Sequence, residues 1–451
     1  MEECSLRQGR GTGLYVESVS DHSHRSQKLG IPVMKVAFIV TKFPSLSQTF
    51  ILNQITGLLD RGHDVTIYAK IHRDEPFIHA DVEKYHLLDR TFYCNSYQAM
   101  SANNLLRILK TTFIVIIGFF KKPKLLLKLL HVLKLGKKAT SPYSWQEIAT
   151  FLSRDMHSYD IVHCHFGPNG KLGALLKELG AIKGKCITAF HGYDMSAYIK
   201  EGGDTVYDSL FRAGDFFLPI SKRWKEELIK LGCEEQRIAV HRMGIDTGRF
   251  AFTPRKPRED GKVHILTVAR LVEKKGVQYG IQAVAKVLKK YPHVEYRIAG
   301  DGPLRSELQS LIDVLNINGH VKLLGWKRQE EIVELMHSAD ILLAPSVTSK
   351  NGDQEGIPVI LMEALSQGLP ILSTQHSGIP ELVRDGEFGF LVPERDVKAL
   401  AEKLEYFIEH PEIWPGMGWA GRDYVARYYD INKLNDQLVS LYQRLLDGRL
   451  S

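Results

Sequence analysis

Two glutamates eight residues apart, Glu355 and Glu363, flank the expected start of a helix. An apolar run at Ile341–Ala344 predicts a buried strand ahead of them, and Pro358 suits the first turn of the helix, where its missing N–H costs no hydrogen bond. A helix start offers free N–H groups and partial positive charge, which suits a phosphate group. The carboxylates would instead accept hydrogen bonds from hydroxyl groups, as a sugar and a ribose would supply. The spacing alone is a weak signal, because 25% of the chain is charged.

Two cations follow the first expected strand of the second half, Val263–Val268. Arg270 and Lys275 lie in the loop after that strand. A guanidinium can bind two phosphate oxygens and an ammonium acts as a point charge, so the pair suits one diphosphate. A solvated loop also carries such cations, but loops at the carboxyl ends of strands are where α/β sheets bind ligands. We therefore expect a diphosphate site at this loop.

A glycine turn, Gly300-Asp-Gly302, follows the next expected strand, Val294–Ala299. Glycines let a backbone approach a nucleotide closely, although such turns are common and weak evidence alone. The chain lacks the G-x-x-x-x-G-K-[ST] loop, and it lacks a G-x-G-x-x-G after its first strand. These two absences argue against ATP hydrolysis and against a dinucleotide cofactor.

His191 and Asp194 follow an expected strand of the first half, Cys186–Phe190. A histidine there can hydrogen-bond a sugar hydroxyl, with Asp194 orienting it, or it can be a satisfied structural histidine; the residues leave both interpretations open. His163 and His165 share one face of another expected strand, as a metal-binding pair would. No carboxylate or cysteine cluster with ligand spacing accompanies them, so we expect no metal site.

Strands and helices alternate along both halves of the chain, which predicts the α/β class with two doubly wound Rossmann-like domains facing a cleft. In the first half, the strands are expected at Lys35–Val40, Val65–Ala69, Asp160–His165, Cys186–Phe190, Asp215–Ile220 and Arg237–His241. In the second half, they are expected at Val263–Val268, Val294–Ala299, Val321–Leu324, Ile341–Ala344 and Ile371–Thr374. The expected divisions are a first domain over 34–250, a linker over 251–262, a second domain over 263–410 and C-terminal helices over 411–451.

The composition is ordinary for a globular protein, with 44% hydrophobic residues. Five scattered cysteines favour a reducing compartment over a disulfide framework. The net charge is +7, but residues 101–140 contain nine Lys/Arg and no Asp/Glu, so the rest of the chain is slightly negative. Because the basic excess is local, the charge does not indicate a nucleic-acid-binding protein.

Two segments lie outside the regular alternation. Residues 1–33 are polar and have no apolar core, so we interpret them as a disordered leader and not as a secretory signal. Residues 104–138 are rich in leucine and lysine and predict a basic amphipathic insert. Such a helix suits an anionic membrane surface, with an ordinary solvated basic face as the alternative. We therefore expect a cytoplasmic protein, peripheral at the inner face of the plasma membrane.

Taken together, the residues at the strand ends resemble a known family. The matching motifs are Arg270 with Lys275, Gly300-Asp-Gly302-Pro303, Glu355-x7-Glu363, His191-Gly-x-Asp194 and Ser377-Gly-Ile-Pro-Glu381. They are similar to those of retaining GT-B glycosyltransferases of family 4, also called glycosyl transferases group 1, over about residues 34–446. The stretches 43–50 and 351–358 further resemble the bacterial exopolysaccharide branch, which includes colanic acid glycosyltransferases. Phe43-Pro44-Ser45 stands where many relatives have a Gly-Gly pair.

The resemblance implies a role for each matching position. Arg270 and Lys275 would hold the donor diphosphate, and Glu363 would bind the ribose hydroxyls. Glu355 and His191 would contact the transferred sugar from opposite domains. The implied donor-binding residues are Arg270, Lys275, Gly300, Gly302, Glu355, Gly356, Ile357, Pro358, Glu363 and Asp194. The resemblance implies no cofactor and no obligatory metal.

The implied reaction moves a hexose from a nucleotide-sugar, a UDP-sugar in preference to GDP-mannose, to a lipid-linked or growing saccharide with retention of configuration. Nucleotide-sugar 2-epimerases share the two-domain architecture, so an isomerase is an alternative, and a non-catalytic nucleotide-sugar-binding subunit is another. The last helix, expected at about Ile431–Leu446, would cross back onto the first domain.

Overall fold

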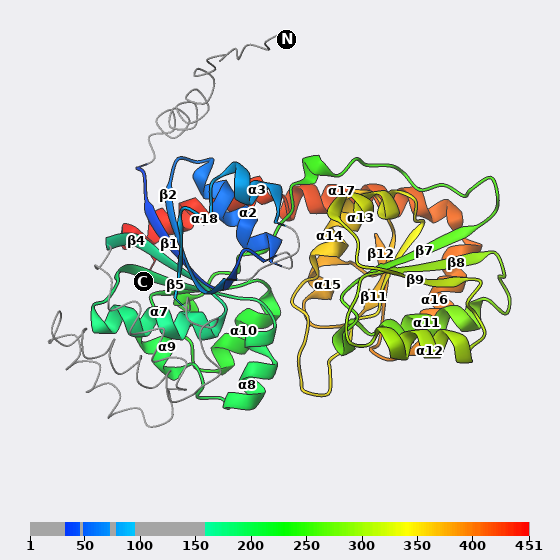
Figure 1. Ribbon diagram of the computed structural model, residues 1–451, viewed down its shortest axis with the longest axis horizontal. Coiled ribbons are helices and arrows are strands. Elements are labelled where there is room, and N and C mark those ends of the chain that lie inside the picture. The colour runs from blue at the N-terminus through cyan, green and yellow to red at the C-terminus, as the bar shows by residue number, and fades with distance from the viewer. Residues whose placement is uncertain (1–31, 46–47, 73–77, 95–157, 451) are drawn as a thin grey trace, which may run out of the picture.

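The computed structural model describes residues 32–45, 48–72, 78–94 and 158–450. Within these ranges the chain forms two α/β domains (Figure 1). The expected leader over 1–33 lies outside the described residues except for its last two positions, and the basic insert over 104–138 lies wholly outside them. In the described part of the chain, no helix is long and apolar enough to cross a membrane.

The first domain is a parallel sheet between helices. From edge to edge the described strands are β3 (Thr91–Tyr93), β2 (Asp64–His72), β1 (Lys35–Phe43), β4 (Ser158–His165), β5 (Lys183–Phe190) and β6 (Phe216–Pro219). The helices that follow these strands are α2 (Thr49–Leu59), α3 (Ala80–Lys84), α7 (Gly167–Leu179), α8 (Ala197–Gly202), α9 (Asp208–Ala213) and α10 (Lys222–Lys230). Figure 1 shows α2 and α3 on one side of the sheet and α7, α9 and α10 on the other.

The second domain repeats this plan. Its described strands, from edge to edge, are β12 (Gly389–Val392), β11 (Ile371–Thr374), β10 (Ile341–Ala344), β7 (Val263–Val268), β8 (Val294–Ala299) and β9 (Val321–Gly325). Its helices are α11 (Val277–Val287), α12 (Arg305–Val314), α13 (Gln329–His337), α14 (Val359–Ser366), α15 (Ile379–Leu382), α16 (Val397–Glu409) and α17 (Trp414–Tyr428). The predicted α/β class with two doubly wound domains is confirmed.

Both sheets have the same strand order. If the strands of each domain are numbered 1 to 6 along the chain, the first described sheet has the order 3-2-1-4-5-6. The second described sheet has the same order when it is read from β9 to β12. The order reverses between β1 and β4 in the first domain, and between β7 and β10 in the second. In open α/β sheets, ligands bind in the crevice beyond the carboxyl ends of the strands at this reversal. The topology therefore places the loops after β7 and β10 at the expected ligand site.

One predicted strand is wrong. Arg237–His241 does not form a strand, because residues Glu235–Arg237 make a 3-10 turn and only Ile238 bridges to Phe217 of β6. The N–H of Ala239 donates to the carbonyl oxygen of Phe217 at 3.1 Å, and the N–H of His241 donates to that of Pro219 at 3.0 Å. The segment therefore runs beside β6 but does not form the continuous hydrogen bonding of a strand. The first sheet therefore ends at β6 on this side, while its other edge, β3, and the edge strand β12 of the second sheet are short strands that were not predicted.

The expected linker over 251–262 is docked on the second domain. Arg255 is only 4% exposed, and its guanidinium donates to the carbonyl oxygen of Met336 at 3.0 Å. Arg258 donates to Asp340 at 3.1 Å. These contacts fix the segment to α13 and to the residue before β10.

The chain crosses between the domains twice, and the two crossings are hydrogen-bonded to each other. The N–H of Ile245 donates to the carbonyl oxygen of Tyr429 at 2.9 Å, and the N–H of Ile431 donates to that of Ile245 at 2.9 Å. Ile245 and Tyr429 are buried in the core of the second domain. The hinge between the domains is therefore a paired strand-like contact and not a single flexible linker.

The last helix, α18 (Ile431–Leu446), packs against α2 of the first domain. Asp430 caps it by accepting hydrogen bonds from the N–H groups of Asn432 and Lys433. Its buried apolar residues recur every three or four positions, as one helix face requires; they are Ile431, Leu434, Leu438, Val439, Tyr442 and Leu445. The final residues of the chain thus belong to the core of the first domain.

Replacing Leu438 with alanine is expected to lower the free energy of unfolding by about 2–5 kcal/mol, because the side chain is fully buried between α18 and the first core. Urea unfolding followed by tryptophan fluorescence measures this loss. Gln437→Ala, one residue earlier on the exposed side of α18, is the matched control and should change stability by less than about 0.5 kcal/mol. A Leu438→Ala protein as stable as the control would contradict the packing of α18.

Candidate active site

The loops after β7, β8 and β10 meet at one edge of the second sheet, because β7 lies between β10 and β8. The loop after β7 carries Arg270, Lys274 and Lys275. Arg270 is exposed, and its side chain makes no hydrogen bond or ion pair with any residue in the described ranges. Its guanidinium is therefore available to a ligand.

Glu355 forms a buried cluster with the two lysines. Lys275 Nζ lies 3.1 Å from one carboxylate oxygen, and Lys274 Nζ lies 3.6 Å from the other. Burial opposes ionisation of Glu355, but the two ammonium groups outweigh it and hold the pKa of this carboxyl at about 2. Lys274 also pairs with Asp353 at 3.0 Å. The network joins the loops after β7 and β10 and keeps Glu355 ionised at neutral pH.

The backbone of Glu355 is held from both sides by the loop after β11. Its N–H donates to Nε2 of His376 at 3.0 Å, and its carbonyl oxygen accepts from the hydroxyl of Ser377 at 2.6 Å. Because Nε2 of His376 accepts, the ring carries its proton on Nδ1, which faces the carboxylate of Glu394. These contacts fix the direction in which Glu355 points.

Helix α14 starts directly after this loop and has no cap. Pro358 occupies the N-cap position, no side chain accepts from the first turn, and the first turn contains no acidic residue. The side chain of Ile357 is buried in the second core, so this residue presents only its backbone. The first N–H groups of α14 remain for another acceptor, and the positive end of the helix dipole favours an anion there.

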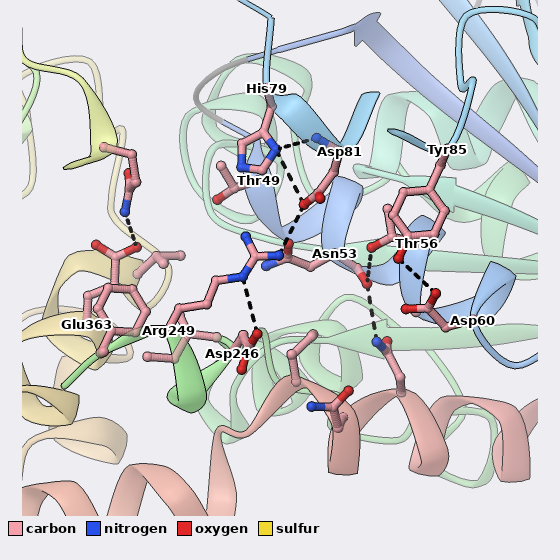
Figure 2. A pocket seen from close by; sticks show the side chains of 18 of the residues that line it. Thr49, Asn53, Thr56, Asp60, His79, Asp81, Tyr85, Asp246, Arg249 and Glu363 are labelled. Atoms are coloured by element: carbon pink, nitrogen blue, oxygen red, sulfur yellow. Dashed lines mark hydrogen bonds and ion pairs between the residues drawn. The ribbon is translucent and has the colours of Figure 1, made fainter. Parts of the chain in front are cut away.

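Glu363 lies further along α14 and faces a cavity between the domains (Figure 2). Its carboxyl accepts a hydrogen bond from the Gln329 side chain at 3.4 Å. Burial raises the pKa of Glu363 to about 7. The two glutamates therefore differ, since Glu355 is ionised throughout the physiological range and Glu363 is half protonated at neutral pH.

The glycine turn after β8 packs against the loop after β7. Gly300 has φ +135°, and a Cβ added to it would lie 1.8 Å from the carbonyl oxygen of Ala269. A Cβ on Gly302 would lie 2.6 Å from the carbonyl oxygen of Leu271. Only glycine fits at Gly300, where both the backbone angle and the close contact exclude a side chain. The turn brings the end of β8 against the residues around Arg270.

The first domain meets this site through the loop after β5. A Cβ on Gly356 would lie 2.3 Å from the carbonyl oxygen of His191, and one on Gly192 would lie 3.0 Å from the nitrogen of Gly356. The N–H of Gln354 donates to the hydroxyl of Ser196 at 3.2 Å. The two backbones touch at this point, so the structure brings His191 and the Glu355 loop together across the domains.

The His191 ring is enclosed and neutral. Its Nε2 lies 3.1 Å from Nδ1 of His165, and Phe50 and Phe166 flank it with ring centroids at 4.6 Å. Burial lowers the pKa of His191 to about 3. Nδ1 of His191 has no hydrogen-bond partner in the described part of the chain. A neutral imidazole with one unused nitrogen can make one further hydrogen bond to a ligand.

Asp194 does not orient this ring, contrary to the sequence-based interpretation. Its buried carboxylate accepts hydrogen bonds from the backbone N–H groups of Gly167 and His191 at 3.0 Å and of Gly192 at 2.9 Å. Burial raises the pKa of Asp194, and the three N–H groups oppose that rise. Asp194 therefore fixes the loop backbone, and we do not place it among the ligands of a donor.

His163 and His165 lie on one face of β4, as expected, with stacked rings whose centroids are 4.6 Å apart. His163 Nδ1 contacts the hydroxyl of Tyr442 on α18 at 2.5 Å. Burial lowers the pKa of His163 to about 3. Across the ranges that the structure covers, no three His, Cys, Asp or Glu side chains are placed to hold a metal ion. His163 and His165 instead connect β4 to its neighbours, because His163 contacts Tyr442 of α18 and His165 contacts His191.

Sequence reasoning missed Lys274, His165, His376 and Glu394. Lys274 adjoins Lys275, and residue type alone does not tell that both side chains contact Glu355. His165 was noticed only as a possible metal ligand. His376 immediately precedes the Ser377 motif, and that position was the available signal.

Two doubly wound domains whose facing loops present cations, an ionised carboxylate and an uncapped helix start are typical of the GT-B fold. Comparison with known families agrees: residues 249–421 match the family described as glycosyl transferases group 1, and residues 47–249 match glycosyltransferase family 4. The chain belongs to this glycosyltransferase family, and the resemblance inferred from its motifs is confirmed.

Two bacterial relatives are similar over most of their length. WcaL, a glycosyltransferase assigned to colanic acid biosynthesis in Salmonella typhimurium, is 38% identical over 417 residues, which cover 91% of this chain and 100% of the relative. AmsK, an amylovoran biosynthesis glycosyltransferase of Erwinia amylovora, is 38% identical over 381 residues, or 82% of this chain and 90% of the relative.

Solved structures share the fold at low identity. HepE from Anabaena, in complex with UDP, superimposes with a TM-score of 0.66 at 17% identity, covering 91% of this chain and 100% of that one. Sucrose-phosphate synthase from Thermosynechococcus elongatus has the same TM-score and identity and covers 92% of this chain. At this identity the likeness shows the fold alone.

Proposed function

We propose that this glycosyltransferase moves a hexose from a nucleotide-sugar, with UDP-sugars preferred to GDP-mannose, to a lipid-linked or growing saccharide in exopolysaccharide synthesis. One observation carries the proposal. Ionised Glu355, Lys275 and the uncapped start of α14 lie together, and His191 of the other domain contacts the same loop. This arrangement suits a ligand with a sugar at one end and a diphosphate beside it.

We propose separate roles for these groups during transfer. The bond between the anomeric carbon and the diphosphate breaks, so negative charge develops on the leaving phosphate and positive charge on the sugar ring. Arg270, Lys275 and the first N–H groups of α14 stabilise the leaving group. Glu355 and the neutral His191 ring hold the sugar. We further propose retention, with the acceptor oxygen attacking from the face that the phosphate leaves and its proton passing to a phosphate oxygen.

The comparisons support the finer parts of this proposal without testing them on this chain. The Anabaena protein was solved with UDP and with UDP-glucose, which favours a UDP-sugar. The names of WcaL and AmsK point to exopolysaccharides. Nothing in the proposed chemistry requires a metal or a cofactor, because fixed cations and helix N–H groups carry the leaving-group charge.

A donor panel tests the function. The purified protein is incubated with UDP-glucose, UDP-galactose, UDP-GlcNAc or GDP-mannose, with and without a saccharide acceptor, and products are identified by NMR. We expect hydrolysis or transfer with one UDP-sugar, and an anomeric coupling that matches the donor demonstrates retention. Epimerised UDP-GlcNAc in the absence of acceptor would make the protein an isomerase. Binding without turnover of any donor would make it a binding subunit.

The affinity for UDP-glucose is expected to rise about tenfold between pH 6 and pH 8, because a ribose hydroxyl donates best to the ionised form of Glu363, whose pKa is raised to about 7. The pyrophosphate diester does not titrate in this range, so calorimetry at several pH values isolates the protein group. Glu363→Gln should bind with an affinity that does not change with pH. A wild-type affinity that is flat with pH would remove Glu363 from the ribose site.

The same raised pKa affects the ligand-free protein. The folded carboxyl of Glu363 binds its proton more tightly than an unfolded glutamate does, so its contribution to stability falls as pH rises from about 4.5 to about 7. The melting temperature of wild type relative to Glu363→Gln should therefore decrease across this window.

We also propose that the protein works at the inner face of the plasma membrane through its basic amphipathic insert over 104–138, which has nine cations and no acidic residue. Vesicles that contain anionic phosphatidylglycerol should bind the protein in sedimentation assays, and salt at about 1 M should release it, since the Debye length then falls to about 3 Å. Neutral vesicles are the control. Binding that is equal on both lipids and indifferent to salt would contradict this electrostatic attachment.

A further inference from the structure

A polar cavity of about 170 Å³ lies between the two domains beside Glu363 (Figure 2). Helix α2 of the first domain forms one wall, with Thr49 and Asn53. Helices α13 and α14 of the second domain form the opposite wall, with Gln329 and Glu363. The hinge segment and the start of α18 form the remaining sides. The cavity is thus built from parts that meet only when both domains and the last helix are in place.

The charges of the lining exclude an anionic ligand. Figure 2 shows Arg249 in the centre of the view, where its guanidinium pairs with Asp81 at 3.3 Å and with Asp246 at 3.2 Å. Asp60 and Glu363 also line the cavity, so carboxyl groups outnumber the arginine. A phosphate or an acidic sugar would be repelled, and the only strong cation is already paired with two carboxylates.

The lining also offers unused hydrogen-bonding groups. Asn435 is 1% exposed and donates to the carbonyl oxygen of Asn53 at 3.2 Å, but its Oδ1 has no partner in the described residues. The side chains of Thr49, Asn53 and Asn432 likewise make no hydrogen bond within the described ranges. A buried amide oxygen without a protein partner is unfavourable, so it is available to accept a hydrogen bond from a ligand. Amides and hydroxyls both donate and accept, as do the hydroxyl groups of a sugar.

Apolar side chains complete the lining. Ile245 and Phe250 come from the hinge, and Val359 comes from the first turn of α14. A sugar ring has an apolar C–H face as well as hydroxyl edges. A lining with both apolar and polar side chains therefore fits a sugar better than a small ion.

We propose that this cavity binds a neutral saccharide unit of the acceptor, one that is held beside the donor and does not itself react. The inference rests on the proposed glycosyl transfer and adds the acceptor site to it. The cavity extends from Val359 and Glu363 of α14 towards α2, and the cations assigned to the diphosphate, Arg270 and Lys275, lie outside its lining.

Saturation-transfer NMR on the full chain tests the proposal. Glucose, galactose, mannose and fucose are each added to the protein, first alone and then with saturating UDP. We expect at least one of these sugars to receive saturation from the wild-type protein and to keep it when UDP is present. Asn53→Leu and Asn432→Leu should each reduce the signal by at least about fivefold, and Gln437→Leu, on the exposed side of α18, should not change it. Circular dichroism identifies any variant that fails to fold, and Asn432 is exposed enough for its replacement to be tolerated.

Three results would overturn the proposal: saturation of none of the four sugars, loss of the signal when UDP is added, or a signal that both asparagine variants leave unchanged. Loss on addition of UDP would assign the cavity to the nucleoside. UDP binding is measured in the same samples by calorimetry. Absence of UDP binding would count against the proposed function, whereas UDP binding without a sugar signal would count against the acceptor site alone.

Discussion

The Glu355→Gln variant is expected to transfer sugar at least about 100-fold more slowly than the wild-type protein while it remains folded. Glutamine keeps the size of the side chain but removes the charge that holds Lys275 at 3.1 Å and Lys274 at 3.6 Å. The lysines then repel each other, and Lys275 no longer has a fixed position beside the leaving phosphate. Initial rates with the active donor of the panel measure the effect.

Stability must be separated from catalysis in this variant. Removing the carboxylate that pairs with both lysines, although Lys274 keeps its pair with Asp353, is expected to lower the free energy of unfolding by about 1–3 kcal/mol. A domain of ordinary stability tolerates this loss. Asp353→Asn is the matched control, because Asp353 pairs with Lys274 at 3.0 Å but is not in contact with Lys275. If Glu355→Gln and the control have equal rates, Glu355 has no role in transfer beyond charge balance.

Gly356→Ala is expected to reduce transfer by about 100-fold through geometry alone. The added Cβ would lie 2.3 Å from the backbone carbonyl oxygen of His191, and neither atom can move away by a side-chain rotation. The first domain must move back from the loop, and a displacement of about 1 Å at a reacting centre costs about 100-fold in rate. Each domain keeps its own core, so the melting temperature should change little.

Gly319→Ala is the control for this variant, since a Cβ there meets nothing within 4 Å. Small-angle scattering with and without UDP-glucose reports the separation of the domains. The expected result is a more open Gly356→Ala protein that the donor does not close. A variant with full activity would show that the backbone contact between His191 and Gly356 is not needed in the reactive state.

Sequence patterns were sufficient for the fold because several central strands are mostly apolar. Segments such as Ile341–Ala344 and Val263–Val268 are buried on both faces of the sheet, so most of their residues are apolar and they are easy to recognise in the sequence. The edge strands β3 and β12 are three and four residues long, and β12 begins with a glycine. With a threonine or a glycine at the first position, these two segments are not uninterrupted apolar runs like Ile341–Ala344, and their pairing with a neighbouring strand decides their structure.

The candidate site was predictable where a motif lies in one loop and not where distant segments meet. Arg270, Lys275 and Glu355 follow strand ends and were found. The contact of His165 with His191 joins two strands, and the one between Asn53 and Asn435 joins residues 382 positions apart. Nothing local marks such pairs, because the crossing of α18 onto the first domain creates them.

The position of α18 also sets the order in which the protein can be completed during synthesis. A ribosome that has just translated Tyr429 has made every described strand of both sheets, and every residue of the second core is then available. The first core still lacks Leu438, Tyr442 and the other buried residues of α18. The domain that emerges first therefore waits, with the apolar face of α2 uncovered, until the last helix is released. Nascent chains stalled before residue 431 should be the form of this protein that chaperones bind most strongly.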